Sequence, residues 1–136
     1  MSPFEFTVEG PPVSQQAGNR TRLQEWKRRV SLAAARHWSH GDLPLDGSLQ
    51  ITVVYYHDSV VIRMDNDNMV KPIQDALIGQ IYVDDRQITD MRVRKTNRRG
   101  PFIVERLSAM LAEAFVRNRE FIYVRIEAAP DHMELL

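Results

Sequence analysis

The sequence contains no cysteine in its 136 residues. Disulfide scaffolds, thiolate metal sites and cysteine nucleophiles are therefore excluded. No apolar run approaches the ~20 residues that a membrane span needs, and the N-terminus lacks the basic and then apolar segments of an export signal. We expect a cytoplasmic protein without a membrane partner.

The sequence also has no excess of charge of one sign, because 18 basic and 18 acidic residues cancel. A neutral sum argues mildly against nucleic acid as a partner, but the distribution of charge is more informative. Basic residues gather in two groups, and five aspartates share the short region between them. The basic residues are Arg20, Arg22, Lys27, Arg28 and Arg29, and then Arg86, Arg92, Arg94, Lys95, Arg98 and Arg99; the aspartates are Asp65, Asp67, Asp75, Asp84 and Asp85.

The pattern of apolar residues predicts alternating strands and helices in one domain spanning residues 1–136, with a tail from residue 129. Alternation predicts strands at 4–9, 49–57, 89–94 and 121–127, and a recurrence at threes and fours predicts helices at 21–39, 68–78 and 103–117. The strands have one polar face. We therefore expect the α/β class, of α+β type: a small, mixed, largely antiparallel four-stranded sheet covered by helices, in the order β-α-β-α-β-α-β.

The aspartates are arranged in a way that favours a metal site. Asp65 and Asp67 are two residues apart at the start of a predicted helix, and the segment after that helix can bring Asp85 back beside them. At ~5 Å and an effective dielectric of ~20, each pair of carboxylates repels by about 3 kcal/mol, so a cation would stabilise the cluster. Oxygen ligands without thiolates favour Mg²⁺, with Mn²⁺ as a substitute. Lys71 could contact a phosphate as a point charge.

Two other interpretations use the same residues. Asp and Asn in front of a helix commonly cap it, and Asp-Asp in front of a strand commonly forms a turn, so this alternative stays open. A calcium loop of the EF-hand type is excluded. Met69 stands where its third oxygen ligand belongs, Val70 where its glycine belongs and Ala76 where its final glutamate belongs.

The segment from residue 65 to 95 resembles a known family. It contains Asp65-x-Asp67-Asn68-x-x-Lys71-x-x-x-Asp75-Ala76-Leu77 and then Tyr82-x-Asp84-Asp85-x-Gln87-x-x-Asp90. This pattern is similar to the signature of RusA-type Holliday junction resolvases, and Phe6-Thr7-Val8-x-Gly10-Pro11-Pro12 resembles the family's opening strand and turn. The resemblance implies a homodimeric, Mg²⁺-dependent endonuclease that binds four-way junction DNA, makes paired nicks in recombination and repair, and needs no organic cofactor.

The resemblance also assigns roles to residues. Asp65, Asp67 and Asp85 correspond to the catalytic, metal-holding aspartates and Lys71 to the essential lysine, with Asp84 and Asn68 as assisting candidates. For DNA contact we expect Arg63, Arg86, Arg92, Arg94, Lys95, Arg98 and Arg99. Residues 101–117 are an insertion relative to the short family members. A junction-binding module without catalysis, or a metal-dependent nuclease for other branched or duplex DNA, remains as an alternative.

Overall fold

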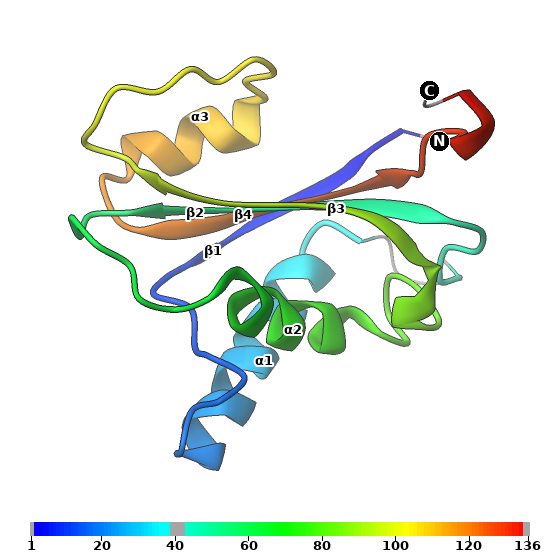
Figure 1. Cartoon of the computed structure of the whole chain (residues 1–136), viewed down its shortest axis with the longest axis horizontal. Helices are drawn as coiled ribbons and strands as arrows, with labels where there is room; N and C mark the ends of the chain where they lie inside the picture. The colour runs from blue at the N-terminus through cyan, green and yellow to red at the C-terminus, as the bar shows by residue number, and fades with distance from the viewer. Residues whose placement is uncertain (1, 39–42, 135–136) are drawn as a thin grey trace.

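The computed structural model describes residues 2–38 and 43–134. Within these residues the chain alternates between strands and helices in the predicted order (Figure 1). The elements are β1 (Phe4–Glu9), α1 (Arg20–Ala35), β2 (Leu49–His57), α2 (Asn66–Leu77), the 3₁₀ turn η1 (Asp85–Gln87), β3 (Ile88–Asn97), α3 (Ala109–Val116), β4 (Phe121–Ala128) and the 3₁₀ turn η2 (His132–Glu134).

The four strands form one sheet in the order β1-β4-β2-β3. β4 runs antiparallel to both β1 and β2, whereas β2 and β3 are parallel. The predicted mixed, largely antiparallel sheet is therefore confirmed. A parallel pair needs a crossover connection, and α2 lies on that crossover. The crossover places the start of α2 shortly after the end of β2.

The main apolar core lies between the sheet and the two helices α1 and α2, which both cover the lower face in Figure 1. Trp26 of α1, Ile51 of β2 and Ile73 of α2 are almost completely buried there. Their positions follow from the predicted stripes, because the apolar residues of each helix face the sheet. The core fixes the position of α2. It thereby also positions residues 58–67, here called the acidic segment, which run from the end of β2 into the first turn of α2.

The predicted boundaries of α1 and α2 need correction. α1 ends at Ala35 instead of residue 39, which itself lies outside the described residues, and His37 is exposed rather than packed on the apolar stripe. α2 starts at Asn66, two residues early, and continues through Pro72. Proline donates no hydrogen bond, so Pro72 leaves the carbonyl of residue 68 without its usual helical donor. The backbone amide of Gln15 donates to this carbonyl instead, at 2.8 Å.

The second face of the sheet carries a smaller core under α3. Tyr56, Phe115 and Phe121 pack there with ring centroids 4.8–5.3 Å apart. The predicted helix 103–117 is wrong in its first part, because α3 begins only after Ser108, whose side chain accepts the amide of Leu111 and caps the helix. Residues 101–107 form an irregular strap, on which Ile103 is 89% exposed.

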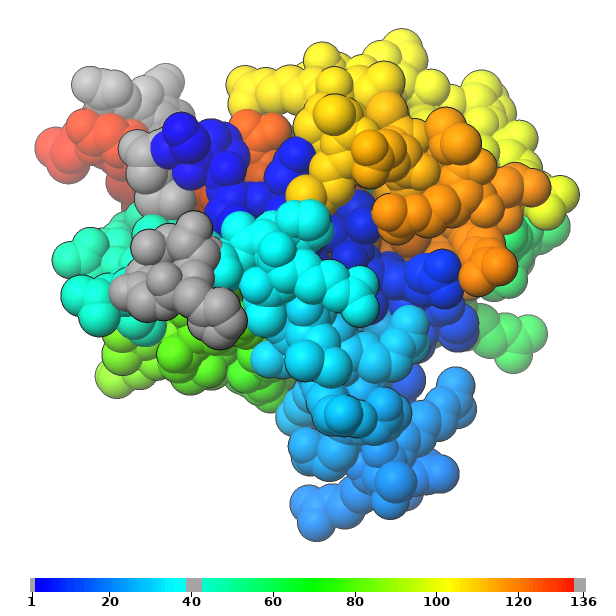
Figure 2. Space-filling model, turned by 180° about the vertical axis from the view of Figure 1, so that it is seen from behind, coloured from blue at the N-terminus to red at the C-terminus, as the bar shows by residue number. Residues whose placement is uncertain are grey.

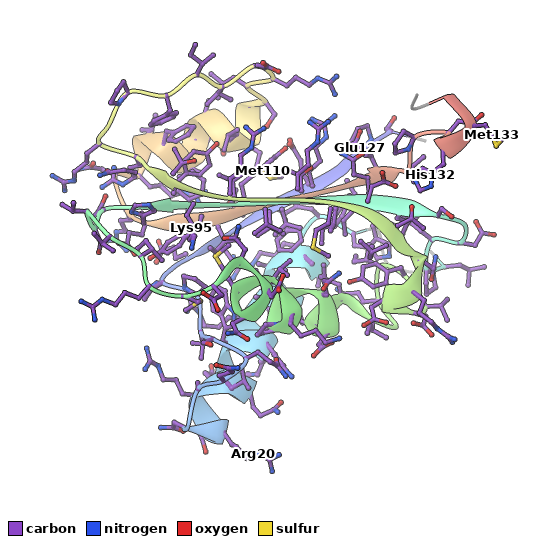
Figure 3. The ribbon with its side chains drawn as sticks, in the orientation of Figure 1. Arg20, Lys95, Met110, Glu127, His132 and Met133 are labelled. Atoms are coloured by element: carbon purple, nitrogen blue, oxygen red, sulfur yellow. The ribbon has the colours of Figure 1, made fainter. Side chains whose placement is uncertain are left out.

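Figure 2 shows the molecule from behind, where β1 (dark blue) runs between α1 below and α3 above. The N-terminal end of α1 projects away from the sheet, and Arg20 lies at its tip (Figure 3). Within residues 2–38 and 43–134, no helix has both the length and the apolar character needed to cross a membrane.

The packing of α3 generates a stability prediction. Leu111 is 2% exposed, so Leu111→Ala should lower the free energy of unfolding by about 2–5 kcal/mol through lost burial and a cavity. Val116 of the same helix is 83% exposed, and Val116→Ala should change it by no more than about 0.5 kcal/mol. Urea denaturation of both variants measures the two values. Equal losses would contradict the observed orientation of α3.

Candidate active site

Asp65 and Asp67 lie at the N-terminal end of α2 with exposed side chains. Asp65 occupies the N-cap position, but its carboxylate makes no capping hydrogen bond within the described residues. Asp67 lies in the first turn. The positive end of the helix dipole favours negative charge at both positions. The capping interpretation therefore fits the position of Asp65 but not its side chain, which is available to a ligand.

Two contacts from β3 hold the segment that leads into α2. The ammonium of Lys95 donates to the carbonyl of Met64 at 2.8 Å, directly in front of Asp65. Lys95 lies on the α2 side of the sheet (Figure 3). The side-chain amide of Asn66 also approaches the carbonyl of Val93, at 3.5 Å. The predicted DNA contact Lys95 thus supports the acidic segment itself and places a positive charge next to it.

A polar network anchors the other end of this segment, where β2 ends. Asp58 pairs with Arg98, with 2.8 Å between Oδ1 and Nε, and hydrogen bonding from Arg98 lowers the pKa of Asp58 below its ordinary value. The backbone amide of Asp58 donates to Glu120, which also accepts the hydroxyl of Tyr55. Arg98 further donates to Asn118. These contacts tie the start of the acidic segment to β3 and β4.

An ion pair of Lys71 links α2 to η1. Its ammonium lies 2.8 Å from a carboxylate oxygen of Asp85 and 3.0 Å from one of Asp75. Hydrogen bonds to Asp85 and then to Asp75 raise the pKa of Lys71, so the ammonium stays charged at neutral pH. Asp67 lies one helical turn before Lys71 on α2. Asp85 thus contacts Lys71, in the middle of α2, and its predicted position beside Asp65 and Asp67 stays a prediction.

The contacts of Asp84 give it a structural role in the turn before β3. Its carboxylate accepts the backbone amide of Arg86 and pairs with the Arg86 guanidinium at 2.9 Å, which lowers the pKa of Asp84 to about 2. Gln87 completes a capping box with it. The turn interpretation fits Asp84 and its neighbour Arg86, whereas Asp85 points its charge to Lys71.

The residues fit a divalent cation by donor chemistry, because Asp65, Asp67 and Asp85 offer carboxylate oxygens of the kind that Mg²⁺ and Mn²⁺ prefer. The expected crowding of three carboxylates is not observed: within residues 2–38 and 43–134, no group of three or more histidine or acidic side chains lies close enough to hold a metal. Lys71 supplies the positive charge that Asp85 takes instead.

The predicted DNA contacts fall on different surfaces. Arg92 and Arg94 pair in register with Thr52 and Val54 of β2, so they face the α3 side, opposite to α2. They line a groove of about 340 Å³ beneath residues 103–106. Arg63 is exposed in the acidic segment, and Arg99 is exposed beside it, with its guanidinium 3.4 Å from Asp58. The side chain of Arg98 is only 7% exposed and pairs with Asp58, which does not fit the predicted contact with DNA.

Sequence reasoning missed the anchoring pair of Asp58 and Arg98, as well as Glu120. These residues lie 40 and more positions apart, so no local spacing connects them. The parallel register, which pairs His57 with Asn97, brings positions 58 and 98 together at the ends of two neighbouring strands. Predicting the contact between Asp58 and Arg98 would have required knowledge of how β2 and β3 pair.

The chain was also compared with known proteins. The family described as endodeoxyribonuclease RusA matches residues 9–105, which is more than two thirds of the chain. The matched range includes the acidic segment, Lys71 and Asp85, and ends before α3. No curated protein matches the chain.

The anchor of the acidic segment predicts a pH dependence. Because the pKa of Asp58 is lowered in the folded state, its charge contributes stability above an ordinary value near 3.8, and this is lost as the pH falls below it. At pH 7, Asp58→Asn should lower Tm by a few degrees, since it leaves the buried Arg98 without its counter-ion. The difference from wild type should shrink below pH 3.8. Calorimetry across pH measures this, with the exposed Asp46→Asn as the control; a difference independent of pH would count against the ion pair.

Proposed function

This chain belongs to the RusA family of endodeoxyribonucleases, and on that premise we propose that it resolves four-way DNA junctions. The enzyme acts as a homodimer, uses Mg²⁺ or Mn²⁺, and makes paired nicks in DNA recombination and repair in the cytoplasm. A symmetric dimer suits a four-way junction, because its two equal sites can each meet one of two equivalent strands.

The ion pair between Lys71 and Asp85 is the observation that carries this proposal. It joins η1 to α2 at 2.8 Å, one helical turn after Asp67. Family motif residues separated along the chain thus have a direct contact on the side of the sheet that α2 covers. Asp65 and Asp67 stand exposed at the start of the same helix, so their carboxylates are open to a ligand on that side.

Each residue has a separate role in the proposed reaction. Asp65, Asp67 and Asp85 would hold the cation, which when bound supplies a water of lowered pKa and neutralises charge on phosphoryl oxygens. The Lys71 ammonium neutralises charge that develops on the scissile phosphate. Lys95 holds the backbone in front of Asp65. In-line attack by water on the phosphorus breaks the bond to the 3′ oxygen, which leaves as the 3′ hydroxyl, and the other product carries a 5′ phosphate.

The DNA approaches the α2 side of the molecule. Arg63 presents exposed positive charge in the acidic segment, and the exposed Arg99 lies beside it next to Asp58. Arg20 lies at the projecting end of α1 (Figure 3), and Arg22 follows in the first turn of that helix. The loop in front of α1 is docked on α2 through Gln15. Phosphate contacts of this kind orient a duplex without reading its sequence. A second arm of the junction can reach Arg92 and Arg94 around the exposed edge of β3.

Cleavage of a synthetic four-way junction tests the proposed reaction. Wild type should nick opposite strands with Mg²⁺ or Mn²⁺, and excess chelator should abolish nicking. Asp65→Asn, Asp67→Asn, Asp85→Asn and Lys71→Met should each lower the rate by at least about 100-fold, because each removes a charge required at the reacting phosphate. Asp46→Asn, which changes an exposed loop residue, should retain the wild-type rate.

Other outcomes separate the alternatives. Nicking in excess chelator would overturn the role of the metal. Junction binding without any nicking, unaltered by Asp67→Asn, would indicate a binding module. Faster cleavage of flaps or plain duplex would indicate a nuclease for other DNA.

Salt dependence tests whether the second face contacts DNA. Each lost phosphate contact should reduce the slope of log Kobs against log[salt] by about 0.9. Arg92→Gln with Arg94→Gln should therefore reduce it by about 1.8 for junction DNA. The exposed Arg36→Gln, at the end of α1, is the control. An unchanged slope in the double variant would confine the DNA to the α2 side.

A further inference from the structure

Four charges of alternating sign connect α1 to η1 by way of α2. Lys27 of α1 lies 3.6 Å from Asp75 of α2, and Asp75 lies 3.0 Å from Lys71. Lys71 in turn lies 2.8 Å from Asp85. Lys71 therefore stands between two carboxylates, of which the proposed function uses only Asp85.

The pair at the α1 end of this series of charges, Lys27 and Asp75, is better shielded from water than Lys71. The side chains of Lys27 and Asp75 are 23% and 25% exposed, whereas that of Lys71 is 42% exposed. The fully buried Tyr82 lies nearby, and burial followed by the charges of Asp85 and Asp75 raises its pKa, so its hydroxyl stays neutral. The charge balance of the group is thus carried by two ammonium groups and two carboxylates.

Helix stability does not explain why Asp75 follows Lys71 by four positions. On a helix surface the pair is more favourable when the acid precedes the base, because that order also suits the helix dipole. Here the base precedes the acid. The less favourable order, together with the second cation at Lys27, indicates that the role of Asp75 is to pair with Lys71 and Lys27 rather than to stabilise the helix.

The proposed function creates a conflict that Asp75 can resolve. A divalent cation at Asp85 competes with the Lys71 ammonium for the same carboxylate and then repels it. With Asp85 as its only partner, Lys71 would swing into solvent, since a lysine side chain has about 2 kcal/mol of rotamer entropy to regain. A second carboxylate on the same helix offers the ammonium an alternative close to the reacting phosphate.

We propose, resting on the function above, that Asp75 is the positioning residue for Lys71. Asp75 retains the ammonium when a divalent cation takes Asp85, and Lys27 holds Asp75 in place. Asp75 thereby weakens the competition between Lys71 and the cation, and keeps Lys71 at the site after the exchange. It acts through Lys71 and binds neither the cation nor the DNA.

A calorimetric titration of the full chain with Mn²⁺ alone measures the Mn²⁺ affinity and tests this proposal without any turnover. Lys71→Met should tighten Mn²⁺ binding by about threefold or more, because it removes the competing ammonium. Asp75→Asn should weaken binding by about three- to tenfold in the wild-type background, since Lys71 then has only Asp85. In the Lys71→Met background the same substitution should have an effect of less than about twofold.

Controls distinguish this role from a general loss of charge or of fold. Glu25→Gln removes an exposed acid of α1 that pairs only with Arg28 at 3.6 Å within the described residues, and should leave Mn²⁺ binding unchanged. Asp75→Glu restores the carboxylate and should recover most of the affinity. In junction cleavage, Asp75→Asn should lower kcat while KM for the junction stays near the wild-type value. Thermal unfolding without metal verifies that each variant is folded.

The possible failures are distinguishable. An equal loss of Mn²⁺ affinity from Asp75→Asn in both backgrounds would overturn the positioning role, because it would show a long-range charge effect independent of Lys71. No change in either background would overturn it as well. Wild-type chain that neither binds Mn²⁺ nor nicks a junction would overturn the proposed function, and this inference with it.

Discussion

The contact between Lys71 and Asp85 is the interaction on which the rest of the candidate site depends. It joins η1 to α2 one helical turn after Asp67, and both side chains are partly exposed. An ion pair in such a position contributes at most about 1 kcal/mol to stability. The apolar core beneath α2 therefore holds the two elements together, and the ion pair sets the direction of two charges. A weak pair of this kind can exchange its partner at low cost, as a site that takes up a cation requires.

A missing hydrogen-bond donor links a second segment to the same helix. Because Pro72 has no amide hydrogen, the carbonyl of Asn68 is free to accept from Gln15. The loop in front of α1 is attached at that point, so the projecting end of α1 is fixed relative to the acidic segment. A residue that weakens the case for a helix in the sequence thus helps to assemble the surface around the site.

Local spacing and the family resemblance predicted the parts of the site that lie close together along the chain. Asp65, Asp67 and Lys71 lie at the start of one helix as expected, and the mixed sheet was predicted from its half-polar strands. The predicted start of α3 was wrong because Ile103 and Leu107 have the spacing of an apolar helix face, although both side chains are exposed. The partnership of Asp58 with Arg98 was missed because it depends on the pairing of β2 with β3. Single-sequence patterns do not contain that register.

The side chains of β3 point alternately to the two faces of the sheet, and for this reason the basic residues in and after this strand do not form one continuous surface. Lys95 faces α2 and supports the acidic segment, whereas Arg94 faces the α3 side, since neighbouring residues of a strand point to opposite faces. Arg98, beyond the end of the strand, is neutralised inside the protein by Asp58. β3 is an edge strand of the sheet, so its free edge lies between the two faces. A polyanion that contacted basic residues on both faces would have to pass around this edge, and a branched DNA can do so more readily than a straight duplex, because its arms diverge.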